Sequence, residues 1–348
     1  MDQCSLFYDW NEHRRRYLPT HVELDDGTLH DGMQSLSVVH PTIDEKLKLL
    51  HLMDELGIHV ADIGHPGAGK CVAEQVERLA REIVDCGLRI RPACAARTLV
   101  ADIQPIVEIS QRVGIPIEAH VFVNSSPLRR SAESWSLDRL LSCSREALSF
   151  SVSQGCTTMY VTEDTTRCYP GTVHTLLSAA IECGAKRVCL CDTAGLSTPN
   201  GVMALIKYVR QEIIGIERDV KIDWHGHADR GLSLANALAA VESGAHRIHG
   251  TALGIGKRSG HTPMDLLLYN LRLLGIVEHA PASLHAYCEA VAAYTGHPIP
   301  ENYPVVGAGT VQRGPGLHAA MIRESYVGED DHRMPDEVLE APMAEGAQ

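Results

Sequence analysis

The sequence predicts a (β/α)8 barrel, a fold of the α/β class in which eight parallel strands alternate with helices. Two observations support this. From about residue 21, eight short β-like runs alternate with longer helical patterns. Several helical patterns also end in a glycine just before the next β-like run, where a left-handed C-cap is common. A doubly wound open sheet is the alternative, but no GxGxxG sequence follows the first run.

The β-like runs are rich in apolar and β-branched residues. They cover residues 21–26, 58–64, 88–94, 117–123, 157–163, 186–192, 220–226 and 246–254. Two of the helical patterns between them cover 42–57 and 136–155. The first has Thr42 as its candidate N-cap, with Glu45 three residues later to complete a capping box. The glycines expected to end helices are Gly57, Gly87, Gly155, Gly184 and Gly244.

The pattern divides the chain into three parts. Residues 1–20 form an N-terminal extension, 21–275 the barrel, and 276–348 a C-terminal subdomain with an acidic tail. This last part starts with a helical stretch at 281–295 and continues with a segment rich in Gly and Pro. We therefore expect a short helical and irregular subdomain appended to the barrel, with a tail that frays.

Composition restricts the classes of function. The chain has 31 Lys and Arg against 44 Asp and Glu, a net charge of −13, so a nucleic-acid partner is not expected. The N-terminal segment lacks the apolar core of a signal peptide, and no later apolar run could span a bilayer. The 11 cysteines include no CxxC pair, as expected for reduced thiols. These features predict a soluble cytoplasmic protein without membrane association.

The C-terminal ends of the strands carry the catalytic groups in such barrels. Here residues 224–231 read WHGHADRG, so His225 and His227 are two apart and point to the same side of a strand. Two imidazoles with a carboxylate from another strand can hold a divalent metal, and Asp31 after the first run is the natural carboxylate. The other polar residues at strand ends include Asp26, His30, His120, Asn124, Glu163, Asp164, Asp192, Thr193 and His261.

Longer stretches around these residues form motifs. DDGTLHDGMQS starts at the end of the first run. HGHADRGLSLANALAAVESGAHRIHGTALGIGKRSGH starts at the end of the seventh run and contains the eighth. AHVFVNSSPLRR, TEDTTR, CDTAGLSTP and TGHPIPENYPVVGAGTVQRGPGLH complete the set. In their order along the chain these motifs resemble those of the metal-dependent acyl-CoA:2-oxoacid condensing enzymes, whose signatures include DTTLRDGEQ and HxHNDxG. These are the isopropylmalate, homocitrate and citramalate synthases, which share a barrel with hydroxymethylglutaryl-CoA lyase. The resemblance covers about residues 20–320.

The resemblance implies a reaction. Asp31, His225 and His227 would bind a divalent metal (Zn, Mn or Mg), which is chelated by a 2-oxoacid and polarises its ketone. An acyl-CoA, acetyl-CoA in the first instance, would lose a proton from its methyl group and attack that ketone, and thioester hydrolysis would then release CoA.

The resemblance also implies roles around the metal. His120 and Thr193 would lie against the 2-oxoacid, and Glu163 would lie near the side chain of this acceptor and help to set specificity. His318, from the appended subdomain, would reach over the mouth as an acid/base group. In the synthases this subdomain commonly covers a partner's barrel, which implies a homodimer.

The sequence departs from the family pattern near the mouth. His30 replaces the arginine that is expected to donate to the enolate or ketone oxygen. We retain His30 as a catalytic candidate. A cationic histidine could replace the charge of the arginine with a shorter reach, and a histidine that is neutral at pH 7 is the alternative. His261 replaces an asparagine, and as a third imidazole ligand it would favour Zn or Mn over Mg. Lys257 stands where the signature has glutamate, and Lys257 or the matching Arg258 could contact the CoA phosphates. The remaining departures are Met33 and Ala228.

Alternatives stay open at the level of residues and of function. His120 on an apolar run could be a core histidine, and Glu163 could cap a strand end. A synthase is the favoured function. A lyase of the same barrel is the second, although lyases carry a cysteine in the loop after strand eight and residues 252–261 contain none. A metal-binding homologue without turnover, suggested by His30, is the third.

Overall fold

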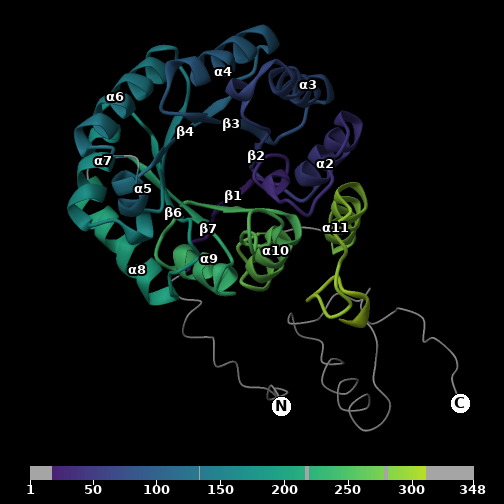
Figure 1. Ribbon diagram of the computed structural model, residues 1–348. Helices are drawn as coiled ribbons and strands as arrows, with labels where there is room; N and C mark the ends of the chain where they lie inside the picture. Colours follow the sequence, from purple (N-terminus) through teal and green to yellow (C-terminus); the bar gives the residue numbers. More distant parts are fainter. Residues whose placement is uncertain (1–17, 133, 216–218, 278–280, 311–348) are drawn as a thin grey trace, which may run out of the picture.

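The computed structural model describes residues 18–310, except 133, 216–218 and 278–280. In this part of the chain, eight parallel strands form a closed barrel, each beside its sequence neighbours and β8 beside β1. The strands line the centre and the helices form an outer ring (Figure 1). The strands are β1 (Glu23–Asp26), β2 (Val60–Asp62), β3 (Arg91–Arg97), β4 (Glu118–Asn124), β5 (Thr158–Glu163), β6 (Arg187–Asp192), β7 (Lys221–Gly226) and β8 (Arg247–Gly250). The predicted barrel is confirmed.

Each predicted β-like run contains one of these strands, but two boundaries differ. β3 begins three residues later than residue 88 and continues to Arg97. β8 ends at Gly250, whereas the predicted run continued to residue 254. Leu253 and Gly254 have φ values of 54° and 66°, so the chain leaves the extended conformation and turns. This turn starts the loop that carries His261 back to the mouth.

The helices begin and end at the predicted caps. The Thr42 hydroxyl accepts a hydrogen bond from the Glu45 backbone, and the Glu45 carboxylate accepts the Thr42 N–H at 2.7 Å. The five glycines predicted to end helices all have positive φ, from 64° to 97°. The helices are α2 (Ile43–Glu55), α3 (Lys70–Cys86), α4 (Val100–Val113), α5 (Pro127–Ala132), α6 (Leu137–Ser153), α7 (Pro170–Glu182), α8 (Pro199–Tyr208), α9 (Ser233–Glu242), α10 (Met264–Leu273) and α11 (Pro281–Thr295).

Short helical turns supplement these helices. Most of them follow a strand or precede a helix at the mouth of the barrel. They are η1 (Gly32–Gln34), η2 (Pro66–Ala68), η3 (Thr165–Arg167), η5 (Ala252–Gly254) and η6 (Ala308–Thr310), with a π-helical turn, η4 (Val209–Ile214), after α8.

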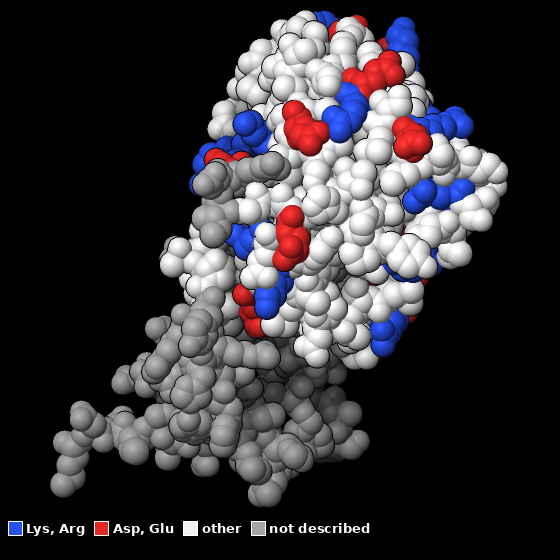
Figure 2. Space-filling model, turned by 90° about the vertical axis from the view of Figure 1, so that its left-hand side faces the viewer, with Lys and Arg blue, Asp and Glu red and all other residues white. Residues whose placement is uncertain are grey.

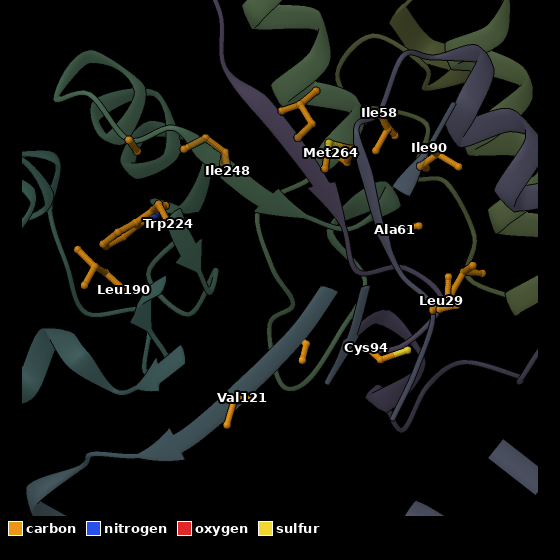
Figure 3. Packing of buried hydrophobic residues seen from close by; sticks show 14 of the residues in the cluster. Leu29, Ile58, Ala61, Ile90, Cys94, Val121, Leu190, Trp224, Ile248 and Met264 are labelled. Carbon is orange, nitrogen blue, oxygen red and sulfur yellow. The ribbon is translucent and has the colours of Figure 1, made fainter. Parts of the chain in front are cut away.

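The main core lies between the strands and the helix ring. Leu190, Trp224 and Ile248, from three neighbouring strands, point outward and are fully buried (Figure 3). On β7 the outward Trp224 is followed by His225, which lines the cavity at the barrel mouth. The alternation of side chains along a strand therefore aims the predicted metal ligand into the barrel.

The barrel interior holds a cluster of charged side chains beside a small apolar cluster of Met159, Cys189 and Cys191. Arg247 is fully buried, and its guanidinium contacts Asp223 at 2.6 Å. Arg187 joins the same aspartate at 2.8 Å and contacts Glu23 at 2.8 Å. Glu118 contacts Arg247 from the opposite side. Since buried charges are costly unless paired, this interior ion cluster holds β1, β4, β6, β7 and β8 in register below the mouth.

Helix α11 docks on the barrel through polar contacts as well as apolar ones. It packs against α2, as Figure 1 also shows. The hydroxyl of Tyr287 donates to the buried carboxylate of Asp26 and lies 3.2 Å from the hydroxyl of Thr28. The helical stretch predicted at 281–295 is thus confirmed, while the domain boundaries stay predictions.

Two observations bear on the surroundings of the protein. None of the described helices is both long and apolar enough to cross a bilayer. The cysteines in the described part of the chain are free thiols, as predicted.

On the face shown in Figure 2, basic and acidic side chains are interspersed among uncharged ones, without a broad patch of one sign.

Candidate metal and active site

Three histidines converge at the mouth. His225 lies near the end of β7, and His227 directly follows that strand. His261 lies in the loop after β8, where its backbone forms an isolated antiparallel β-bridge with His227. One ring nitrogen from each lies within 4.8 Å of the other two. Both ring nitrogens of His261 and Nδ1 of His227 are buried and lack a hydrogen-bond partner among the described residues. Three histidines this close together, with buried ring nitrogens that lack partners, fit a bound metal ion.

Burial sets the charge of these groups. It lowers the pKa of His225 to about 3, and it lowers the pKa values of His227 and His261 as well, so neutral imidazoles face the site at pH 7. The carboxylate of Asp31 lies 3.9 Å from Nε2 of His225. Burial opposes its ionisation, but His30 and His225 outweigh this and hold the pKa of Asp31 below its ordinary range. Neutral imidazoles and an ionised carboxylate are the protonation states that a metal requires.

The loop after β8 depends on glycine to place His261. Gly256 has a φ of 156°, and a Cβ atom there would lie 2.7 Å from Cδ2 of the His261 ring. Gly260 has a φ of 86°, and its Cβ would overlap the carbonyl oxygen of Gly254. Both positions therefore need glycine, which lets the loop fold tightly enough to bring the third imidazole to the other two.

His30 is held by an acidic partner that the sequence analysis did not identify. Its Nδ1 lies 2.8 Å from a carboxylate oxygen of Asp62, at the end of β2. Burial lowers the pKa of His30, but the Asp62 carboxylate more than compensates and raises it to about 9. His30 is therefore cationic at pH 7, so of the two alternatives that the sequence left open it is the charged form that can replace the family's arginine.

A cavity of about 520 Å³ lies over the three histidines. Thr193 lines it, and its hydroxyl accepts the Asp164 N–H at 2.8 Å, which leaves the hydroxyl hydrogen for an acceptor in the cavity. Glu163 lines it from the end of β5 and accepts a hydrogen bond from Asn124 at 3.0 Å. Burial raises the pKa of Glu163. Both residues therefore face the space where the sequence analysis predicted substrate.

His120 borders the same cavity but also belongs to the interior. Its Nε2 lies 3.3 Å from Glu118 and 3.7 Å from Asp25. Its ring stacks at 6.0 Å on His249, which contacts Asp223 at 3.2 Å. His120 therefore fits both interpretations, as a substrate contact and as a core histidine. It contacts the interior ion cluster and also lines the cavity.

The structure adds two residues to the site, His249 and Asp62, that the sequence analysis missed. It also gives Arg258 a different role from the contact with CoA phosphates that was expected. His249 and Asp62 line the cavity with the predicted residues. A signal for His249 was its position two residues after Arg247 in the eighth run, on the same face of the strand. Arg258 pairs with Asp229 at 2.8 Å and donates to the backbone of Thr193, so it braces the mouth. His318 lies outside the described residues.

The geometry defines a class of protein: a (β/α)8 barrel with a three-histidine candidate metal site at its C-terminal face. Residues 21–291 match the model of the HMGL-like family, and the chain belongs to this family. Homocitrate synthase AksA from Methanopyrus kandleri is 31% identical, over 89% of this chain and 75% of its own length. A 2-isopropylmalate synthase from Staphylococcus saprophyticus is 29% identical, over 86% of this chain and 59% of its own length.

A solved structure agrees on the fold. The HMG-CoA lyase of Bacillus subtilis superposes with a TM-score of 0.67 at 20% sequence identity, covering 81% of this chain and 96% of that one. The sequence relatives are thus named as condensing enzymes, whereas this structural neighbour is named as a lyase. The family is enzymatic.

Proposed function

We propose that the protein catalyses a metal-dependent Claisen condensation of an acyl-CoA, acetyl-CoA in the first instance, with a 2-oxoacid. The products would be free CoA and a 2-hydroxy acid of the alkylmalate or homocitrate type. The observation that carries the proposal is the convergence of His225, His227 and His261 beside Asp31, under a cavity large enough for a small oxoacid. The similarity to a homocitrate and an isopropylmalate synthase supports the condensing direction.

The donor set suits a divalent metal. His225, His227, His261 and Asp31 would hold it, and three imidazoles favour Zn or Mn over Mg. When bound, the metal supplies Lewis acidity to the ketone of the 2-oxoacid.

The protein side chains supply binding and charge. The cationic His30, held by Asp62, faces the cavity and would stabilise the negative charge that develops on an enolate or alkoxide oxygen. The hydroxyl of Thr193 can donate to the carboxylate of the acceptor, and His120 borders the same space. Glu163, fixed by Asn124, would lie beside the acceptor's side chain. His318 stays a prediction as an acid/base group.

A lyase is the second candidate, and the fold of the Bacillus subtilis lyase favours it. Such an enzyme would use the same metal and the same cavity to break the bond. The two directions share their transition state, so the structure of the mouth supports both, and the reaction has to be measured.

We also propose a homodimer in which a second copy covers the mouth. Large apolar side chains are exposed in the loops and the short helix α5 that follow five different strands at this end of the barrel. They are Leu36, Leu99, Leu128, Tyr169 and Leu196. A ring of exposed apolar groups around a cavity is typical of a surface that another chain covers.

The decisive experiment measures thiol release from acetyl-CoA with pyruvate, 2-oxoisovalerate or 2-oxoglutarate, with and without Mn²⁺, Zn²⁺ or Mg²⁺. We expect metal-dependent release with one acceptor. In His227→Ala, bound metal and kcat/KM should both fall, on the order of 100-fold. His174→Ala, an exposed histidine on α7, is the matched control.

Three results have separate meanings. Release without any added metal or bound metal contradicts the proposed mechanism. Cleavage of the 2-hydroxy acid or a hydroxyacyl-CoA, without net condensation, identifies a lyase. Metal binding without turnover in either direction identifies a homologue that has lost catalysis.

A further inference from the structure

A second cavity lies beside the mouth. Its volume is about 420 Å³, and it opens where β3 and β4 end, against α5 and the start of α6. Phe122, Asn124, Arg129 and Glu163 line both this cavity and the main one, so the two spaces adjoin. The residues that line only the second cavity are Arg97, Thr98, Leu99, Val123, Arg130, Trp135, Arg139 and Cys143. We call this second space the arginine cavity.

The charge of the arginine cavity opposes that of the whole protein. Its lining has four arginines (Arg97, Arg129, Arg130 and Arg139) and one carboxylate, Glu163, whereas the chain carries −13. Low-dielectric walls that concentrate one sign of charge raise the local concentration of an oppositely charged ligand. The arginine cavity is therefore suited to an anion even though the protein as a whole repels anions.

The arginines differ in how they are held. Arg97 is engaged by both carboxylate oxygens of Asp102, at 2.6 and 2.9 Å, so much of its charge is neutralised. Nε of Arg130 is buried and has no hydrogen-bond partner in the described part of the chain. The guanidinium of Arg139 lies 4.2 Å above the ring of Trp135, which orients it at the edge of the cavity. Arg130 and Arg139 are thus the residues through which an anion would be recognised.

We propose that the arginine cavity binds the phosphorylated adenine-nucleotide end of the acyl-CoA donor, with Arg130 and Arg139 on its phosphates. This rests on the proposed condensation. Guanidinium groups recognise phosphate oxygens through paired, charge-assisted hydrogen bonds, and the indole of Trp135 offers a surface for a planar base. The pantetheine arm then passes Asn124 and Glu163 into the main cavity, where the thioester meets the acceptor.

Size favours a nucleotide over a smaller anion. A rival occupant is the distal carboxylate of a dicarboxylic 2-oxoacid, which could extend past Glu163. One carboxylate needs one bidentate arginine, whereas this cavity of about 420 Å³ offers the guanidinium groups of both Arg130 and Arg139. A ligand with several phosphates uses both the volume and the charge.

The test compares Arg130→Gln and Arg139→Gln with Arg145→Gln, which removes an arginine of α6 that pairs with Glu182 instead. Calorimetry with adenosine 3′,5′-bisphosphate measures the nucleotide site without turnover. We expect each cavity variant to weaken this binding by about ten-fold or more, because a charge-assisted hydrogen bond is lost. Arg145→Gln should bind like the wild type. Thermal unfolding checks that each variant is folded.

Kinetics supply the second readout. For the cavity variants we expect KM for acetyl-CoA to rise by about ten-fold, with kcat and the KM of the 2-oxoacid changed less than about two-fold. With S-acetylpantetheine, which lacks the nucleotide, wild type and variants should be indistinguishable.

The inference and the proposed function can fail separately. Nucleotide binding that is equal in the wild type and both folded variants overturns the inference, whether or not the enzyme turns over. A KM increase confined to dicarboxylic acceptors also overturns it and assigns the cavity to the acceptor. Arginine-dependent nucleotide binding without condensation supports the inference and rejects the proposed reaction.

Discussion

At the scale of single residues, His30 shows how a neighbour determines chemistry. A histidine in place of an arginine would lose its charge at pH 7 if it stood alone. The carboxylate of Asp62, 2.8 Å away, raises the pKa of His30 to about 9 and keeps the side chain cationic. The substitution therefore preserves the charge next to Asp31 while shortening the side chain that carries it.

This leads to a prediction for His30. Under the proposed condensation, His30→Gln removes the cation and should lower kcat on the order of 100-fold, the cost of losing one oxyanion donor. His30→Arg keeps the cation and can keep the contact with Asp62, so it should retain much more of the wild-type kcat than His30→Gln does. Thiol-release assays at saturating substrate measure both. If the glutamine variant keeps full activity, His30 is no catalytic residue.

At the scale of elements, α11 is fixed to the barrel by a carboxyl group that is hard to ionise. Asp26 is fully buried, accepts the Tyr287 hydroxyl and the Thr28 N–H, and lies at the end of β1. Burial raises the pKa of Asp26 from 3.8 to about 6, although the hydrogen bonds oppose this. The folded protein therefore holds a proton here more tightly than the unfolded chain does.

The consequence is a pH dependence of stability. The contribution of Asp26 is fully present below about pH 4 and is lost as the pH rises to about 6, a change of at most about 3 kcal/mol. Asp26→Asn cannot lose a proton. Its free energy of unfolding relative to the wild type should therefore rise between pH 4 and pH 7 in urea titrations.

The control is Asp85→Asn, an exposed aspartate on α3. Its difference from the wild type should stay flat over the same pH range. A flat difference for Asp26→Asn as well would show that folding does not raise the pKa of Asp26, against the burial argument.

At the scale of the whole molecule, charge is concentrated inside the barrel and apolar surface at its mouth. The interior cluster around Arg247 and Asp223 provides a fixed floor below the histidines. At the mouth, Leu128 on α5 and Tyr169 in the loop before α7 are 67% and 77% exposed. An exposed apolar rim over a polar cavity is stable in water only at a cost, which a second copy would remove.

The prediction is a dimer of twice 37.9 kDa, measured by light scattering during gel filtration. Replacing Leu128 and Tyr169 with serine together should shift the protein towards the monomer at micromolar concentration, because their apolar burial is lost. Leu273→Ser, at the far end of α10 from the mouth, is the control and should leave the mass unchanged. A monomeric wild type would remove the support for a covering partner.

Much of the site was predictable because its signals are local. Residues two apart on a strand share a face, so His225 and His227 were expected to point into the mouth together, and they do. His261 was expected from its place in a motif, and the structure brings it to a ring-centroid distance of 4.2 Å from His227. Asp62 and the arginine cavity were missed, because their significance arises from contacts between strands and helices far apart in the chain.

The sequence by itself determined the barrel, its strand order and the face to which the metal-ligand pair belongs. Alternation along a strand, capping boxes and glycine stops are short-range properties that can be read from neighbouring residues. Only the tertiary structure decided that Asp62 charges His30, that His249 joins the interior cluster, and that Arg130 and Arg139 line a cavity beside Glu163. The reason is physical: closing a barrel brings side chains from different strands into one low-dielectric space, where burial and opposite charges set their protonation.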